Sequence, residues 1–323
     1  KTIRRMVFAF FILLLNSLAL TMKYLLALLL LFLSTLPAQS SAVGTEPQAD
    51  SLRRELLFHT DDTVAIRTMR ELAWYYTSRN SDSAMHYYNR ALELSDARED
   101  HYLRGRLYYG IGDLFFKNRN YKPALDYYFR FLAEVDRRAA GNADSVKLAG
   151  TYASLYSQLG LCYFNLGNTD NALAYFHKSL AKVEQFKPLN TEKDYLERKM
   201  AMMVNIGSVY LENKKFGESR NWYERALLIN KKLNNVHYGS ALYNNLGIIS
   251  MEQKHYEQAF DYYARALAIR TTRRDTAGMA QVLNNLGKVY YVVKNYAKAE
   301  EVLRRSLALT AGTGNNRSEM FAT

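Results

Sequence analysis

The tetrapeptide NNLG occurs at Asn244–Gly247 and again at Asn284–Gly287, which places its two glycines 40 residues apart. Aligning the chain on these glycines extends the series towards the N-terminus, and an apolar residue precedes each member. The series consists of Gly112, Gly160, Gly207, Gly247 and Gly287. A register kept over this length indicates an internal repeat.

Two further columns keep the same register. A small residue stands twelve positions after every glycine, in the series Ala124, Ala172, Ser219, Ala259 and Ala299. A large side chain follows four positions later, in the series Tyr128, Phe176, Tyr223, Tyr263 and Leu303. Apolar residues at spacings of three and four, on both sides of a short polar break, are typical of two amphipathic helices per unit. We therefore predict an all-α fold of helix pairs, in which small residues let the two backbones approach closely.

One unit carries a family resemblance. Tyr156, Leu159, Gly160 and Tyr163, followed by Ala172 and Phe176, are similar to the W-x2-L-G-x2-Y and A-x3-F pattern of the tetratricopeptide repeat (TPR) family. The resemblance extends over about residues 67–310. It implies a right-handed superhelical α-solenoid whose concave inner surface binds partners.

The chain departs from the family pattern in two respects. No unit has the closing proline, and the period is 40 to 48 residues instead of about 34. The longer period resembles the repeats of kinesin light chains and of bacterial TPR signalling proteins. Without the proline, the second helix of each unit is expected to run on.

These patterns divide the chain into four parts. We expect an N-terminal extension and signal peptide at 1–42 with its true start at Met22, a linker or capping helix at 43–66, six TPR-like repeats at 67–314, and the start of a truncated seventh repeat at 315–323.

The segment Met22–Ala42 has the features of a secretory leader. Lys23 supplies the charged start, Tyr24–Leu33 the apolar centre, and small residues allow cleavage after Ala38 or Ala42. The alternative is an uncleaved membrane anchor. Because no cysteine follows the cleavage site, a lipoprotein anchor is not expected. The segment predicts an exported protein of the bacterial periplasm, attached to the membrane only through this leader or through a missing C-terminal segment.

Composition limits the partners and the chemistry. The formal charge is +12, which favours anionic partners such as acidic peptides. Cys162 is the single cysteine, so neither an intramolecular disulfide nor a cysteine metal pair is possible. The sequence holds no phosphate loop, serine elbow or metal-ligand spacing. We therefore expect no catalytic activity, cofactor or metal. We also expect no nucleic-acid partner: the 26 tyrosines could suggest stacking on bases, but many of them occupy positions where the helix packing needs a large side chain.

The resemblance assigns a second set of positions to the inner groove. One of them carries an amide along four successive units, in the series Gln158, Asn205, Asn245 and Asn285, and a side-chain amide both donates and accepts hydrogen bonds to a peptide backbone. Asn244 and Asn284 stand one position earlier, and Lys288 and Arg106 are cationic groove residues for an acidic side chain. The alternative is that the amides pair with neighbouring helices and stabilise the stack.

Two functions follow from this arrangement. The first is an exported scaffold that binds a peptide or protein segment in its concave groove without catalysis. The alternative is the extracytoplasmic sensor domain of a longer membrane-bound signalling protein, a histidine kinase or DNA-binding regulator, truncated here.

Overall fold

The structure is a computed structural model that describes residues 46–58, 61–140, 145–187, 191–233 and 236–311. All regular structure in these ranges is helical, so the expected all-α repeat solenoid is confirmed. The helices are α2 (Pro47–Phe58), α3 (Asp62–Tyr76), α4 (Ser81–Ala97), α5 (His101–Lys117), α6 (Tyr121–Ala140), α7 (Ser145–Asn165), α8 (Thr169–Phe186), α9 (Glu192–Glu212), α10 (Phe216–Leu233), α11 (Val236–Glu252), α12 (Tyr256–Thr272), α13 (Thr276–Val292) and α14 (Tyr296–Thr310).

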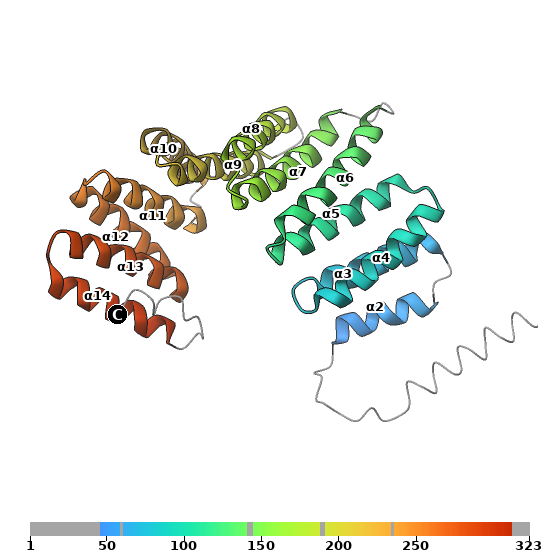
Figure 1. Ribbon diagram of the computed structural model, residues 1–323, viewed down its shortest axis with the longest axis horizontal. Helices are drawn as coiled ribbons and strands as arrows, with labels where there is room; N and C mark the ends of the chain where they lie inside the picture. The colour runs from blue at the N-terminus through green and yellow to red at the C-terminus, as the bar shows by residue number, and fades with distance from the viewer. Residues whose placement is uncertain (1–45, 59–60, 141–144, 188–190, 234–235, 312–323) are drawn as a thin grey trace, which may run out of the picture. The chain divides into compact units, whose positions relative to one another are not determined.

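The chain divides into two compact units, residues 1–51 and 52–323. Helices α3 to α14 lie in the second unit and form successive pairs (Figure 1). We call α3, α5, α7, α9, α11 and α13 the first helices, and their partners the second helices. Helix α3, which opens the first pair, begins at Asp62, whereas the sequence suggested that the repeats begin at residue 67. No helix within the described ranges is long and apolar enough to cross a membrane. The predicted signal peptide and the predicted seventh repeat lie outside the described residues.

Five of the six pairs are joined by a tight turn in which one residue adopts a left-handed backbone conformation. That conformation closes the first helix by satisfying its last carbonyl groups. The residues are Arg119, Gly167, Lys214, Lys254 and Lys294, with φ between 56° and 76°. An asparagine often opens the second helix, because its side-chain oxygen accepts a hydrogen bond from the backbone three residues later. Asn80, Asn168 and Asn295 cap α4, α8 and α14 in this way.

The glycine column lies where the two helices of a pair touch. A Cβ atom built on Gly112, Gly160, Gly207, Gly247 or Gly287 would come within 2.6 to 2.8 Å of the large side chain in the second helix, namely Tyr128, Phe176, Tyr223, Tyr263 or Leu303. Real Cβ atoms do not make such contacts, so only glycine fits. The glycine and the large residue of each unit are therefore one packing device, as their fixed spacing indicated.

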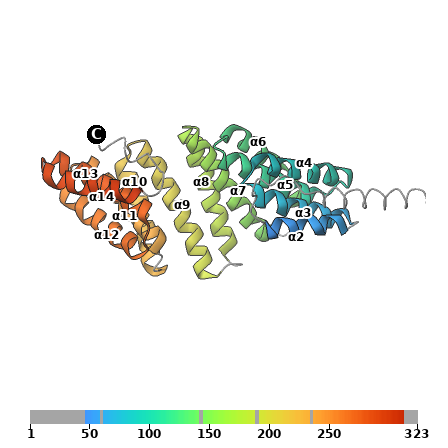
Figure 2. The same cartoon turned by 90° about the horizontal axis from the view of Figure 1, so that it is seen from below.

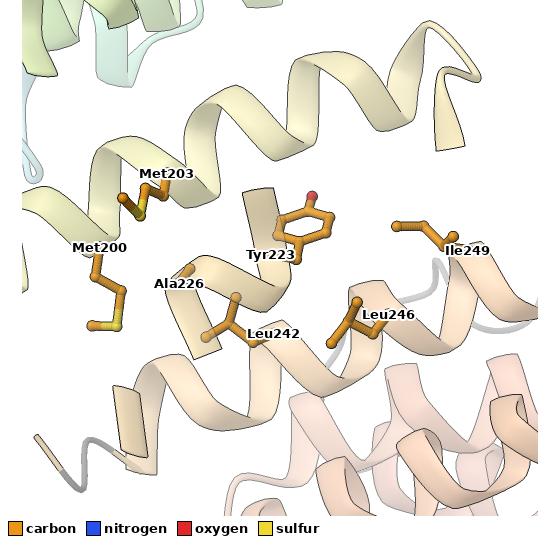
Figure 3. Close-up of a cluster of buried hydrophobic side chains, with 7 residues drawn as sticks. All are labelled: Met200, Met203, Tyr223, Ala226, Leu242, Leu246 and Ile249. Atoms are coloured by element: carbon orange, nitrogen blue, oxygen red, sulfur yellow. The ribbon is translucent and has the colours of Figure 1, made fainter. Parts of the chain in front are cut away.

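The hydrophobic core runs between neighbouring pairs as well as within them. In one cluster, Met200 and Met203 of α9 meet Tyr223 and Ala226 of α10 and three residues of α11. Figure 3 shows these side chains pointing towards one another from the three helices. Since no pair can bury its apolar faces alone, each pair depends on its neighbours for stability.

The intervals that exceed 40 residues are accommodated by longer helices. The first helices α7 and α9 have 21 residues each, whereas α5, α11 and α13 have 17. Figure 2 shows α7, α8 and α9 as long neighbours. Successive first helices also contact each other directly, α3 with α5, α7 with α9, and α11 with α13. These contacts place their outward-facing residues on a shared face.

Candidate functional site

A cavity of about 1020 Å³ opens on the face of the first helices near the N-terminal end of the array. Side chains of α3, α5 and α7 line it, the C-terminal part of α6 forms a further wall, and Tyr88 of α4 and Arg198 of α9 complete the lining. The volume is that of a typical small-ligand or peptide pocket.

Glycines in α5 position the walls of this cavity. A Cβ on Gly105 would meet Phe131 and Glu134 of α6 at 3.2 Å, so its absence lets α6 lie close to α5. A Cβ on Gly110 would lie 2.5 Å from the hydroxyl oxygen of Tyr88 in α4. The stretch around Gly105 and Gly110 therefore brings side chains from both neighbouring second helices to the cavity.

Two aromatic side chains of the cavity are open to solvent. Trp74 on α3 is 67% exposed and Tyr102 at the start of α5 is 50% exposed. Trp74 lies between the buried pairs Leu72–Ala73 and Tyr75–Tyr76, so the packing of α3 turns it away from the core. Exposed aromatic surface of this size is typical of a binding surface rather than of packing.

Arginine side chains gather around the Tyr102 ring. Arg106 Nη1 donates to the Tyr102 hydroxyl at 3.0 Å, and its Cζ lies 5.9 Å from the ring centroid. Arg138 of α6 places its Cζ 5.1 Å from the same centroid. The hydrogen bond from Arg106 lowers the pKa of Tyr102, against the effect of burial, and the charges of Arg106, Arg138 and Arg70 lower it further. Three cations therefore act on one phenol.

Arg70 of α3 is half-buried in the same cavity. Burial lowers the pKa of its guanidinium, and the nearby charge of Arg106 lowers it further. Within the described residues, Arg70, Arg106 and Arg138 form no salt bridge with a carboxylate. Five arginines and three acids, Glu71, Asp113 and Glu134, line the cavity, so its net charge is positive, and the charge of Glu71 partly opposes the shift of Arg70.

Two of the three acidic residues of the cavity have hydrogen-bond partners other than Arg70, Arg106 and Arg138. Glu134, whose side chain is only 9% exposed, accepts from Arg104 Nε at 2.9 Å and from Arg137 Nη1 at 2.6 Å. Asp113 accepts a hydrogen bond from the Tyr128 hydroxyl at 2.6 Å. Burial raises the pKa of Asp113, partly opposed by that hydrogen bond and by the charge of Lys117.

The predicted amide residues lie farther along the array. Asn285 Nδ2 on α13 donates to Asn244 Oδ1 on α11 at 2.9 Å, and Asn244 Nδ2 lies 3.4 Å from Asn245 Oδ1. Asn244 is only 3% exposed. Burial raises the pKa of Tyr223 in the preceding pair, and the Asn245 side chain is among the groups that oppose this shift.

The remaining predicted residues are divided between these two regions. Gln158 on α7 reaches the Tyr109 hydroxyl on α5 at 3.5 Å. Asn205 and Asn284 are half-buried and Lys288 is exposed, whereas Arg106 alone of the predicted residues lines the cavity. The contacts of Asn244, Asn245, Asn285 and Gln158 are those of the alternative, in which amides pair with neighbouring helices. The amide grip on a peptide stays a prediction.

Arg70, Trp74, Tyr102 and Arg138 were not predicted as site residues from the sequence. A usable signal existed for two of them. Ala73 takes the place of the glycine in the first unit, and counting from it puts Arg70 and Trp74 at groove positions. Tyr102 and Arg138 lie outside those positions, because they come from the start of α5 and the end of α6.

Comparison with known proteins agrees with the architecture. Family models described as tetratricopeptide repeat match residues 153–186, 198–272 and 279–311. No curated protein matches the chain in sequence.

Solved structures resemble the fold over most of the chain. The apo form of RapI has 16% identity and a TM-score of 0.65, covering 84% of this chain and 73% of its own. The apo quorum sensor NprR from B. thuringiensis has 15% identity and a TM-score of 0.64, covering 84% and 72%. Aspartyl phosphate phosphatase F from Bacillus subtilis has 15% identity and a TM-score of 0.62, covering 88% and 80%. At these identities the likeness concerns the fold alone.

Proposed function

Because the chain belongs to the tetratricopeptide repeat family, we propose that it is a scaffold that binds a segment of a peptide or partner protein on the face of its first helices. The family's repeats support a protein-binding role in general. The observation that carries the proposal for this chain is the cavity of about 1020 Å³ between α3, α5, α6 and α7, with Trp74 and Tyr102 exposed in it.

The physical argument rests on what these aromatic side chains gain from a partner. A solvent-exposed Trp or Tyr loses contact with water when a partner segment covers it, and such residues supply much of the affinity of protein interfaces. Since both residues stand on rigid helices, the free chain already holds them in place. The partner therefore binds a preformed surface, and little of its binding energy is lost in ordering the scaffold.

The proposal describes binding without catalysis. Repeats of this family are in general non-catalytic interaction scaffolds. The same binding step would also serve as the input of a sensor domain in a longer signalling protein.

Export to the bacterial periplasm is a further part of the proposal. It rests on the sequence of Met22–Ala42, which lies outside the described residues. Fractionation of bacteria that express the full chain tests it. Recovery of the mature chain in the periplasmic fraction supports export, and retention of the full-length chain in the cytoplasm contradicts it.

The binding function is tested by selecting peptides from a displayed random library against the purified full chain. Selected peptides are expected to bind with affinities that Trp74→Ala weakens by roughly tenfold or more, the loss typical of a central interface tryptophan. Leu228→Ala is the matched control, because Leu228 is 65% exposed on the second helix α10 and Trp74 is 67% exposed on α3. Failure to select any peptide, or equal losses for the two variants, would overturn the proposal.

A further inference from the structure

We propose that the cavity recognises acidic segments: Arg70, Arg106 and Arg138 bind the carboxylates of two or more Asp or Glu side chains, while Trp74 packs against the apolar residue between them. This inference deepens the proposed function and rests on it. It names the chemical class of the segment and the residues that select it.

The first support is preorganisation of the guanidinium groups. Arg106 and Arg138 reach the Tyr102 ring from different helices, with Cζ to centroid distances of 5.9 and 5.1 Å. Arg106 is fixed further by its hydrogen bond to the Tyr102 hydroxyl at 3.0 Å. A guanidinium held on an aromatic ring keeps N–H donors free at its edge for a carboxylate, and less side-chain entropy is lost on binding.

The second support is the missing counter-charge. Two other arginines near the cavity have a carboxylate partner within the described part of the chain: Arg104 with Glu134 at 2.9 Å, and Arg137 with Glu134 at 2.6 Å. Arg70, Arg106 and Arg138 form no such salt bridge there, and the half-buried Arg70 is affected more strongly by the charge of Arg106 than by the opposite charge of Glu71. A cationic cluster of this kind is destabilised by its own repulsion, so a bound carboxylate relieves an existing cost.

The third support distinguishes a peptide from a polyanion. Glu71 and Asp113 line the same cavity as the arginines. A nucleic-acid strand or an anionic membrane presents closely spaced negative charge, which would be repelled at these two acids. A peptide places its carboxylates at separate positions and fills the space between them with neutral side chains. The exposed indole of Trp74 supplies an apolar contact for one of those side chains.

The test compares peptides that differ only in charge. A selected peptide is synthesised in its original form and with every Asp and Glu replaced by Asn and Gln, and both are titrated by fluorescence anisotropy against the full chain. The acidic form is expected to bind about tenfold more tightly, an advantage that decreases as salt is raised.

Variants locate that preference in the cavity. Arg106→Gln combined with Arg138→Gln is expected to abolish the preference for the acidic peptide. Arg90→Gln combined with Arg225→Gln is the control, since it removes the same charge from exposed positions on the second helices α4 and α10. The control is expected to retain the preference. Unchanged helix content by circular dichroism in both variants excludes unfolding as the cause.

The outcomes separate this inference from the proposed function. If the library yields neutral peptides whose binding depends on Trp74 but not on Arg106 and Arg138, the acidic specificity is wrong and the peptide scaffold stands. If no peptide is selected, both fail. Equal losses in the cavity variant and the control variant would show general charge attraction and overturn the site. Cavity-dependent binding of anionic lipid vesicles or a single-stranded oligonucleotide that displaces the acidic peptide would also overturn it.

Discussion

The side-chain nitrogen Nδ2 of Asn285 donates to Oδ1 of Asn244 at 2.9 Å, across an interval of 41 residues. The two asparagines come from the first helices of successive pairs, α13 and α11. Because Asn244 is almost fully buried, this hydrogen bond replaces contacts that its carbonyl oxygen would otherwise make with water. The bond therefore fixes one repeat against the next.

A double-mutant cycle on this pair measures its contribution to stability. Asn244→Ala, Asn285→Ala and the double variant are expected to show a coupling free energy of about 1 kcal/mol, the usual net value of an internal hydrogen bond. Urea unfolding followed by circular dichroism provides the measurement. Asn205→Ala is the control, because within the described residues no hydrogen bond involves the Asn205 side chain. A coupling energy near zero would show that the pair does not stabilise the stack.

The contact between Gly247 and Tyr263 gives a second stability prediction. A Cβ on Gly247 would lie 2.6 Å from Tyr263 Cε1 in a fully buried site, so Gly247→Ala forces the ring or the helix to move. The expected cost is about 1 to 3 kcal/mol in the free energy of unfolding. Gly217→Ala is the matched control, since no heavy atom lies within 4 Å of its added Cβ, and it is expected to be neutral or slightly stabilising. Similar effects of both substitutions would contradict this account of the glycine column.

The thiol of Cys162 is expected to react slowly with thiol reagents in the folded chain. Burial, with a further contribution from the charge of Asp113, raises the pKa of its thiol to about 12. A thiol-reactive dye at pH 8 is expected to label the native chain roughly a thousandfold more slowly than the urea-unfolded chain, because the reactive thiolate is scarce and shielded. As Cys162 is the only cysteine, the signal has no background. Rapid labelling of the native chain would show that α7 opens locally.

The pairing of helices could be predicted from the sequence because one packing device recurs without change. Gly160 and Phe176 meet in the structure for the same steric reason as Gly247 and Tyr263, and the fixed spacing between the columns encodes that contact. Any residue that takes part in it could be placed by counting.

The cavity could not be predicted in this way, because it depends on residues outside the repeated contact. Arg138 comes from the end of α6 and Tyr102 from the start of α5, and both lie outside the glycine, small-residue and large-residue columns that define the repeat. In the first unit Ala73 stands in place of the glycine, and counting from it places Arg70 and Trp74 at groove positions without showing which side chains of α5 and α6 they meet. For the amide residues the positions could be predicted from the sequence, but their contacts could not. Their column is regular, yet counting cannot tell whether Asn285 meets a ligand or Asn244.

The charge of Asp113 is expected to affect both the stability of the chain and the binding of a ligand in the cavity. Asp113 lines the same cavity as the arginines that are proposed to hold the ligand, and burial raises its pKa above the usual 3.8. For a carboxyl group with a raised pKa in the folded state, the stabilising contribution is present below pH 3.8 and is lost as pH rises through the folded value. At neutral pH the charged Asp113 is therefore unfavourable both for folding and for a bound carboxylate.

Asp113→Asn is expected to strengthen the binding of an acidic peptide at pH 7 by roughly threefold to tenfold, since it removes a like charge from a partly buried site and Asn still accepts the Tyr128 hydrogen bond. Titration of the peptide between pH 7 and pH 4 is the measurement. The advantage of the variant is expected to shrink as pH falls, because the raised pKa makes Asp113 of the wild-type chain take up its proton at a higher pH than an ordinary aspartate does. Asp126→Asn is the control, since Asp126 pairs with Arg130 outside the cavity. An advantage that persists unchanged at pH 4, or one that Asp126→Asn reproduces, would show that Asp113 does not oppose the ligand.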